Sequence, residues 1–378
     1  MTSPETYMRR CLQLALLGMG HVAPNPMVGA VLVHEDRIIG EGYHQLYGQA
    51  HAEVNCLAAV KEADRPLIPF STLYVSLEPC AHHGKTPPCA NLIVEKKIPR
   101  VVIGCRDPFP AVNGKGIEIL RSAGVEVKMG MLEEECRWVN RRFFAFYTEH
   151  RPFIVLKWAQ SADGKMAAGP TGDGMGGGLT GGGAARTRIS NEYTNRLVHK
   201  WRSEEASILV GPRTALLDDP ALTVRWWNGP NPIRLVIDKE LQLPPTLQLF
   251  DRSVPTIVFN NQRQEGEPGH ATERFAEGQS ALVYYQLATD SSLVHQLAMA
   301  LYQLKIQSVL VEGGPRLLQS FIDEGYWDEA RVITNTELEI PVGLASPVLE
   351  NASLVSRETI LSDTVRYYKK AGAGDGEK

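Results

Sequence analysis

Long apolar runs and an excess of basic residues are both missing from this 378-residue chain. Its apolar stretches are much shorter than the roughly 20 residues that a membrane-spanning helix needs, so we expect no membrane partner. The net charge of −4 and the lack of a basic stripe argue against a nucleic-acid-binding surface. The first residues, Met-Thr-Ser-Pro-Glu, lack the basic start and apolar core of a signal peptide, which predicts a cytoplasmic protein.

Cysteine is missing beyond residue 136. Without a signal peptide, the six cysteines of the first 136 residues predict buried thiols and a metal site rather than disulfides. Four of them lie in apolar segments and are expected in the core: Cys11, Cys56, Cys105 and Cys136. The other two, Cys80 and Cys89, are candidates for the metal site.

The length of the chain suits two domains, and its hydrophobic content of 43% is sufficient for two cores. Helical and strand patterns alternate in both halves, which predicts α/β domains with helices on the faces of the sheets. The segment 149–152 has the composition of a linker. We therefore expect one domain at 1–148, a second at 152–370 and a disordered tail at 371–378.

Hydrophobic periodicity predicts the individual elements. In the first half, helices are expected at 5–19, 51–62, 89–96 and 116–123, and strands at 28–34, 38–42, 72–76, 101–105 and 125–129. In the second half, strands are expected at 153–158, 207–210, 233–237, 256–259 and 308–311, and helices at 191–202, 293–304 and 315–323. The segment 171–183 is saturated with glycine and is therefore expected to be a flexible loop. It lacks the Lys-Ser/Thr ending of a P-loop, which disfavours a phosphate-binding loop here.

Three short motifs carry the chemistry of the first half: His51-Ala52-Glu53, Glu78-Pro79-Cys80 and Pro88-Cys89. One histidine and two cysteines can hold Zn²⁺ and leave its fourth position open for water. A glutamate two residues after the histidine is typical of zinc nucleobase deaminases, in which it transfers protons and is not a ligand. The helices expected at 51–62 and 89–96 place His51, Glu53 and Cys89 at helix N-termini. Cys80 is expected just before or in the first turn of a short element. A closed structural site, with His82 or His83 as fourth ligand, remains an alternative.

The second half contains a buried strand at 308–311 that leads into Gly313-Gly314-Pro315 and a helix. Glycines allow the backbone to approach a ligand closely, and a helix N-terminus attracts phosphate. This turn therefore predicts a nucleotide-phosphate site.

The chain resembles the bifunctional deaminase–reductases of riboflavin biosynthesis over nearly its whole length. The resemblance rests on the eight-residue insert between Cys80 and Cys89, on 21–29 with Gly42-Tyr43-His44, and on 157–165, 210–225 and 311–317. It implies a cytidine-deaminase-like three-layer domain followed by a dihydrofolate-reductase-like α/β domain. It also implies zinc-dependent deamination of a phosphoribosylaminopyrimidine, and then NADPH-dependent reduction of its ribosyl group to ribityl.

The resemblance implies site residues as well, and a homo-oligomer formed through the reductase domain. The substrate residues would be Asn25, His44, Arg202, Leu222, Arg225 and Glu312. The cofactor residues would be Ala159, Thr214, Asp218, Gly313 and Gly314. Lys157 is a further candidate beside the reducing centre, although a structural salt bridge would explain it equally well.

The sequence departs from this resemblance after the first strand of the second half. Arg188 stands where a tryptophan would flank the cofactor, and Arg186 where a serine would touch the substrate. An alternative is therefore a deaminase with an impaired reductase domain. A nucleic-acid-editing deaminase is a third interpretation, which the acidic net charge disfavours. A non-catalytic zinc scaffold is a fourth, and Glu53 speaks against it.

Overall fold

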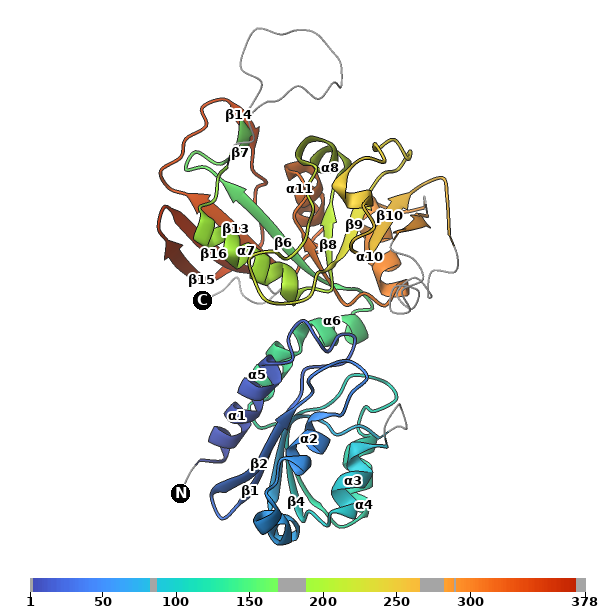
Figure 1. Ribbon diagram of the computed structural model, residues 1–378, viewed down its shortest axis with the longest axis vertical. Helices are drawn as coiled ribbons and strands as arrows, with labels where there is room; N and C mark the ends of the chain where they lie inside the picture. The colour runs from blue at the N-terminus through green and yellow to red at the C-terminus, as the bar shows by residue number, and fades with distance from the viewer. Residues whose placement is uncertain (1–2, 82–86, 169–187, 266–281, 289, 372–378) are drawn as a thin grey trace. The chain divides into compact units, whose positions relative to one another are not determined.

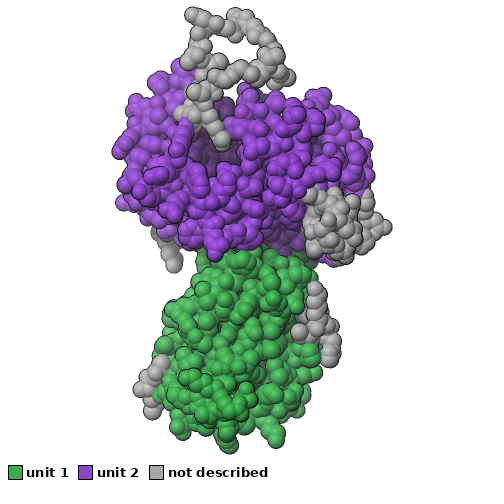
Figure 2. Space-filling model, viewed as in Figure 1, with its two compact units in different colours: residues 1–150 green, residues 151–378 purple. Residues whose placement is uncertain are grey.

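The computed structural model describes residues 3–81, 87–168, 188–265, 282–288 and 290–371. The chain divides into two compact units, 1–150 and 151–378 (Figure 2). The boundary lies within the segment expected to be a linker. Among the described residues, no helix is both long enough and apolar enough to cross a membrane.

The first unit is built on a five-stranded sheet in the order β2-β1-β3-β4-β5. Its strands are β1 (Gly29–His34), β2 (Arg37–Tyr43), β3 (Thr72–Leu77), β4 (Arg100–Cys105) and β5 (Glu126–Met129). Its helices are α1 (Pro4–Leu16), α2 (Ala52–Ala58), η1 (Glu62–Phe70), α3 (Cys89–Glu95), α4 (Lys115–Ser122), α5 (Glu133–Val139) and α6 (Arg141–Thr148). Strands β3, β4 and β5 are parallel, so their carboxyl ends share one edge of the sheet.

Helices cover both faces of this sheet (Figure 1). Alternate residues of the strands point to opposite faces. Val31 and Tyr74 pack with α1, α5 and α6 in one cluster, whereas Leu32 and Leu73 pack with α2, α3 and α4 in another. Four buried cysteines belong to these two clusters: Cys11, Cys56, Cys105 and Cys136. The expected three-layer deaminase-like fold and the expected core thiols are confirmed.

The second unit is built on a nine-stranded sheet in the order β11-β10-β9-β8-β12-β6-β13-β16-β15. Its strands are β6 (Phe153–Gln160), β8 (Ser207–Val210), β9 (Ile233–Ile237), β10 (Thr256–Asn260), β11 (Leu282–Gln286), β12 (Ser308–Val311), β13 (Glu329–Asn335), β15 (Ala352–Ile360) and β16 (Asp363–Lys370), and β7 (Lys165–Ala168) pairs separately with β14 (Gly343–Ala345). Its helices are α7 (Glu192–Glu204), α8 (Pro212–Asp218), η2 (Gln248–Phe250), α10 (Leu293–Gln303) and α11 (Pro315–Asp323). The strands from β11 to β13 are parallel; β16 pairs antiparallel with β13, and β15 pairs antiparallel with β16.

The main core of this unit lies between the sheet and the helices α10 and α11. Val332 of β13 belongs to that core, whereas its neighbour Arg331 faces the other side and lies over the ring of Trp201. Trp201 also contacts Tyr367 of β16, so α7 covers the opposite face. Figure 1 shows α7 in front of this part of the sheet.

Several elements differ from the expectations. The helix expected at 5–19 ends at Leu16, and no element was predicted at α5, α6, α8, β7, β11 or β14. The helix expected at 51–62 ends at Ala58, and the 3-10 helix η1 follows it. Pro66 and Pro69 lie inside η1, and proline lacks the N–H that an α-helix needs at these positions. The strands β13, β15 and β16 occupy a segment for which the sequence predicted no element. In β15 nearly every side chain is exposed, so the apolar–polar alternation of a half-buried strand is missing.

The beginning of the second unit is firmly attached to its sheet. Arg151 forms a double salt bridge with Asp328, with both distances 2.7 Å, and the same carboxylate accepts the N–H of Ile154. At the other end, the N–H of Ala371 donates to the carbonyl of Asn351 at 2.7 Å. The rest of the expected tail, 372–378, lies outside the described residues.

Candidate active sites

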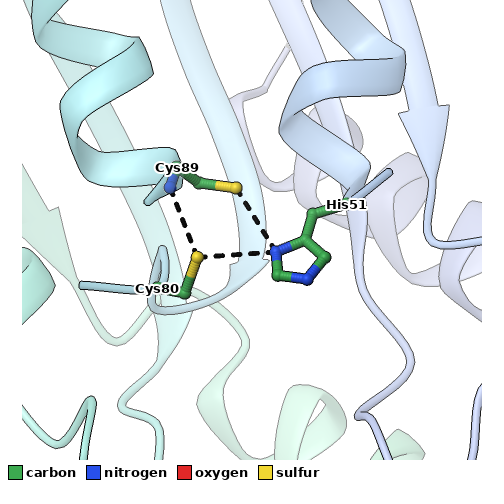
Figure 3. Close-up of side chains that lie close together, drawn as sticks. All are labelled: His51, Cys80 and Cys89. Atoms are coloured by element: carbon green, nitrogen blue, oxygen red, sulfur yellow. Dashed lines mark hydrogen bonds between the residues drawn. The ribbon is translucent and has the colours of Figure 1, made fainter. Parts of the chain in front are cut away.

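The three expected metal ligands come together in the first unit. His51 is the N-cap residue of α2, Cys89 is the first residue of α3, and Cys80 lies in the loop after β3. The Nδ1 atom of His51 is 3.4 Å from both sulfur atoms (Figure 3). The three ligand atoms lie within 4.8 Å of one another, and among the described residues no fourth titratable side chain joins them.

This donor set fits Zn²⁺, which binds thiolate sulfur and imidazole nitrogen in a tetrahedral arrangement. The side chain of Cys89 is the largest influence on the Cys80 thiol and lowers its pKa. His51 and the backbone N–H of Cys89 act in the same direction, burial acts against them, and the resulting pKa is about 4. A thiolate is therefore available at this position at neutral pH. His82 and His83, the alternative fourth ligands, lie outside the described residues, and the described neighbours of Cys80 are loop rather than a short helix.

Glu53 lies in the first turn of α2, beside the ligand cluster, and only 3% of it is exposed. Burial, and to a smaller extent the negative charge of Cys80, raise the pKa of its carboxyl to about 7. A carboxyl group that titrates near neutral pH can both take up and release a proton during one reaction. Its position and its acidity therefore suit a general acid/base.

A cavity of about 340 Å³ opens next to these groups. His51, Glu53 and Cys80 line it, and Asn25 and His44 line it as well. Both residues that the sequence predicted near the substrate ring are thus at the same cavity as the metal ligands.

The tautomer of His44 follows from its two hydrogen bonds. Its Nδ1 lies 3.0 Å from the carbonyl oxygen of Ala50, which can only accept, so Nδ1 carries the proton. Its Nε2 then accepts a hydrogen bond of 3.1 Å from the Nδ2 of Asn25. Burial lowers the pKa of His44, which keeps the ring neutral. This chain of bonds fixes the amide of Asn25, with its Oδ1 available to a ligand.

Two further residues belong to this site and were not predicted. Asp107 follows β4 and lines the cavity, and burial raises the pKa of its carboxyl to about 7. Glu78 follows β3, and its carboxylate accepts N–H groups of Asp107, Gly114, Gly116 and Ile117 at 3.0 to 3.4 Å. One signal in the sequence could have identified these two residues. The strands β3 and β4 are parallel neighbours, so the residues that follow them lie at the same edge of the sheet.

A second candidate site lies in the second unit, where β12 leads into α11. Gly313 follows β12, and Gly314 is the N-cap residue of α11. The N–H of Gly314 donates to the Oγ1 of Thr214 on α8 at 2.9 Å. A Cβ on Gly313 would lie 2.8 Å from the backbone nitrogen of Gly211, which precedes α8. The two strand-to-helix turns are therefore in contact, so the N-termini of α8 and α11 lie close together, and a helix N-terminus attracts phosphate.

Glu312, directly before these glycines, lies in a buried ion cluster. Arg202 of α7 contacts both of its carboxylate oxygens, at 3.1 and 2.7 Å, and the Nζ of Lys157 is 3.8 Å away. Burial alone would raise the pKa of Glu312, but Arg202 and Lys157 outweigh burial and lower it to about 2. Arg202 and Lys157 therefore already have a carboxylate partner within the protein.

The remaining predicted residues lie at different places around this unit. Ala159 is on β6, Leu222 is buried with a φ of +50°, and Asp218 is the exposed last residue of α8. Arg225 donates its backbone N–H to the Nδ1 of His199 at 3.0 Å. His199 was not predicted, and burial together with Arg202 and Arg225 lowers its pKa to about 4.

The segment after β7, in which the sequence departs from the family resemblance, falls mostly outside the described residues. The glycine-rich segment 171–183 and Arg186 belong to the part that the structure does not describe. Arg188 is described and exposed, and it lines an open groove with Arg225.

Comparisons with known proteins identify a family model in each unit. The first half, residues 1–105, matches the cytidine and deoxycytidylate deaminase zinc-binding region, and residues 152–336 match the RibD C-terminal domain. The riboflavin biosynthesis protein RibD of Aquifex aeolicus is 39% identical over 326 residues, which cover 86% of this chain and 84% of that protein. RibD of Escherichia coli is 34% identical over 340 residues, covering 86% and 85%.

Solved structures lead to the same family. A diaminohydroxyphosphoribosylaminopyrimidine deaminase/5-amino-6-(5-phosphoribosylamino)uracil reductase from Thermotoga maritima has a TM-score of 0.82 and 34% identity, with 97% of this chain and 98% of that chain covered. RibD of Acinetobacter baumannii has a TM-score of 0.80 and 29% identity, with 97% and 98% covered. The chain belongs to the RibD family, the bifunctional deaminase–reductases of riboflavin biosynthesis.

Proposed function

We propose that residues 1–148 deaminate 2,5-diamino-6-(5-phosphoribosylamino)pyrimidin-4-one by hydrolysis, and that residues 152–370 then reduce the ribosyl group of the product with NADPH. The observation that carries the first step is the placing of His51, Cys80, Cys89 and Glu53 around one cavity. The Thermotoga maritima relative is named for both reactions, which supports the proposal for this chain.

In the deaminase step, His51, Cys80 and Cys89 would hold zinc, which supplies Lewis acidity to a water molecule. Glu53 takes one proton of the attacking water and passes it to a ring nitrogen; it then takes the second proton of the same oxygen and gives it to the amino group, which leaves as ammonia while the ring carbon becomes a carbonyl. Asn25 offers a donor and an acceptor to the pyrimidine edge. His44 holds that amide in place through its Nε2.

In the reductase step, NADPH would supply a hydride to C1 of the ribosyl group; the C1–O bond of the sugar ring breaks and its oxygen takes up a proton from solvent, which leaves an open ribityl chain. Gly313, Gly314 and the N-terminus of α11 would bind the phosphates of the cofactor, with Thr214, Asp218 and Ala159 beside it. Arg225 and Leu222 would bind the substrate, together with the cluster of Arg202, Glu312 and Lys157. An arginine suits a phosphate group because its planar fork can make two hydrogen bonds.

Glu53→Gln separates the two activities. We expect this variant to keep its zinc and to lose deamination by about 10²- to 10⁴-fold, because an amide cannot transfer the proton. Ammonia release from the diaminopyrimidine measures the first step, and NADPH oxidation with the deaminated product supplied measures the second. The reductase rate should be unchanged in this variant. Deamination at nearly the wild-type rate would remove Glu53 from the mechanism.

Two matched variants complete this experiment. Cys89→Ala should lose bound zinc in metal analysis, and retention of a full equivalent would contradict the ligand assignment. Glu118→Gln changes an exposed glutamate of the same unit and should affect neither zinc nor rate.

We also propose a cytoplasmic enzyme that acts on this small molecule without a nucleic acid partner and that forms a homo-oligomer through its second unit. The net charge of −4 supports the small-molecule substrate. The edge strand β15 supports the oligomer, because its outer edge can pair with another strand, and Leu354 and Val355 on it and Leu361 directly after it are exposed.

The oligomer is tested by light scattering of the purified chain. We expect a mass of at least two copies for the wild type and a smaller mass for the Leu354→Lys, Val355→Lys double variant. A wild type with the mass of a single chain would contradict this proposal and leave the two activities unaffected.

A further inference from the structure

Of the three proposed zinc ligands, Cys80 alone lies in a loop. His51 is the N-cap residue of α2 and Cys89 begins α3, whereas Cys80 belongs to the segment that follows β3. A tetrahedral zinc site requires its ligand atoms at fixed distances from one another. The position of the Cys80 sulfur therefore depends on what holds this loop.

Glu78 begins the same loop, and its buried carboxylate has four N–H partners. Its Oε1 accepts the N–H of Gly116 at 3.0 Å and that of Ile117 at 3.4 Å. Its Oε2 accepts the N–H of Gly114 at 3.0 Å and that of Asp107 at 3.3 Å. Burying a carboxylate is costly unless its oxygens are hydrogen-bonded, and here each oxygen has two donors. The side chain is thus bound to α4 and to the segment before it.

These bonds cap the N-terminus of α4 from outside the helix. The N-cap residue of α4 is Gly114, which has no side chain to accept the first N–H groups. A helix leaves the N–H groups of its first turn unsatisfied, and a negative group is favourable at this end. Glu78 supplies both from the end of β3, so one carboxylate joins the helix to the loop.

The helix α4 is in turn packed with α3, the helix that carries Cys89. Ile117 of α4 and Ile93 of α3 are buried in the same hydrophobic cluster. Figure 1 shows the two helices side by side. Through α4, Glu78 therefore connects the loop of Cys80 to the helix that begins with the third ligand.

The backbone of the loop lies against the same two helices. A Cβ on Gly116 would lie only 2.0 Å from the carbonyl oxygen of Pro79, so the first turn of α4 touches the loop directly. One residue later, the carbonyl of Cys80 accepts the N–H of Ala90 at 3.2 Å, and its Sγ accepts the N–H of Cys89 at 3.3 Å. Successive residues of the loop are thus held first against α4 and then against α3.

We propose that Glu78 is a positioning residue of the deaminase, which holds Cys80 at the distance from Cys89 that zinc requires. It is not one of the three ligands. The same carboxylate binds the backbone of Asp107, which lines the cavity, so it also places a second side chain of the site. The inference rests on the proposed function, because it concerns the zinc of the proposed deamination step.

Glu78→Gln tests this role, because it keeps the size of the side chain and removes one acceptor. The NH₂ group of an amide can only donate, so in either orientation two of the four N–H groups face a donor. Titration of the zinc-loaded, full-length chain with a competing chelator measures zinc affinity. We expect the affinity to fall about tenfold or more, as it does when a residue that orients a metal ligand is lost. With excess zinc, kcat of deamination should fall by a similar factor, and the reductase rate should be unchanged.

Two further variants complete the test. Glu118→Gln makes the same change at an exposed position of α4 and should leave zinc affinity as in the wild type. Glu78→Asp keeps the charge but is one methylene shorter, so it cannot reach all four N–H groups, and we expect a smaller loss of affinity. This variant carries the test if Glu78→Gln does not fold. Thermal unfolding of each variant separates an effect on stability from an effect on zinc.

The outcomes distinguish this inference from the proposed function. A folded Glu78→Gln variant with the zinc affinity of the wild type, whatever its melting temperature, would overturn the positioning role and leave the proposed deamination intact. Failure of both Glu78 variants to fold would also overturn it, since the carboxylate would then support the whole unit rather than the site. A wild type that binds no zinc would instead contradict the proposed deamination itself.

Discussion

Two buried glutamates at the two sites are adjusted in opposite directions by their neighbours. Among the described residues, no arginine or lysine side chain bonds to Glu53, and burial raises its pKa to about 7. Glu312 is equally buried, but Arg202 and Lys157 lower its pKa to about 2. A carboxyl group of the first kind can exchange a proton at neutral pH, whereas one of the second kind stays ionised. The first is therefore suited to proton transfer, and the second to holding cationic groups in place.

The ion cluster around Glu312 should make stability depend on pH. Glu312→Gln leaves Arg202 buried without its charged partner, so we expect unfolding of the second unit to require about 3–5 kcal/mol less at pH 7. The carboxylate stabilises the fold fully above its ordinary pKa of 4.5, and this contribution is lost as pH falls from 4.5 towards 2. The difference between wild type and variant should therefore shrink over this range. Denaturant unfolding at several pH values measures it.

The exposed Glu350 provides the matched control, since Glu350→Gln changes the same group in solvent. It should leave the stability at pH 7 within about 0.5 kcal/mol of the wild type. A Glu312 variant whose stability differs from the wild type by the same amount at every pH would show that the carboxylate is not held ionised.

Both sites are built from the turn between a parallel strand and the next helix. In the first unit, Glu78 follows β3 and accepts two N–H groups from the segment between β4 and α4 and two from the first turn of α4, so the loop that carries Cys80 is attached to the neighbouring turn. In the second unit, the turns at Gly211 and Gly313 touch directly. The position of each site depends on contact between adjacent turns rather than on one turn alone.

The two glycines after β12 should respond differently to substitution. Gly313→Ala places a Cβ 2.8 Å from the nitrogen of Gly211 and 2.9 Å from Leu317, which forces the turns apart. We expect a loss of about 1–3 kcal/mol in stability. In Gly314→Ala the nearest atom, the Oγ1 of Thr214, is 3.4 Å away, so that variant should be nearly neutral. Thermal denaturation of both variants tests this, and equal effects would contradict it.

The sequence predicted those parts of the fold that have strong local signals. The apolar runs at β1, β3, β4, β8 and β12 and the turns that follow them were found close to their observed bounds. The metal ligands were found because their spacing is itself the signal. Asp107 and His199 were missed because a single acidic or basic residue has no spacing to recognise. Their place at a site depends on contacts between segments distant in the chain.

The C-terminal strands were missed for a related reason. Neither β15 nor β16 is a continuous apolar run, and β15 is exposed along most of its length. The strand β16 pairs with β13 and β15 pairs with β16, both antiparallel and through backbone hydrogen bonds, which any sequence can provide. Local periodicity could not have predicted them.

At the scale of the whole molecule, each unit is one continuous stretch of chain with its own core. We therefore expect residues 1–150 and 151–378 to fold when expressed separately. The first fragment should bind zinc and deaminate, and the second should bind NADPH in a titration. A second fragment that is folded but does not bind NADPH would favour a deaminase with an impaired reductase domain.

The order of the strands in the second unit also bears on how the protein is made. The strand β6 is among the first segments of this unit to be synthesised, yet it lies between β12 and β13, which come from far later in the chain. The first unit can complete its sheet while the ribosome is still producing the second, since its strands are all present by Met129. During synthesis, β6 cannot pair with β12 and β13 until nearly all the remaining sequence has been made. A message truncated before β12 would therefore yield a finished zinc-binding half and a second unit whose sheet lacks the strand that joins β6 to β8, so we expect deamination to be the activity that survives incomplete translation.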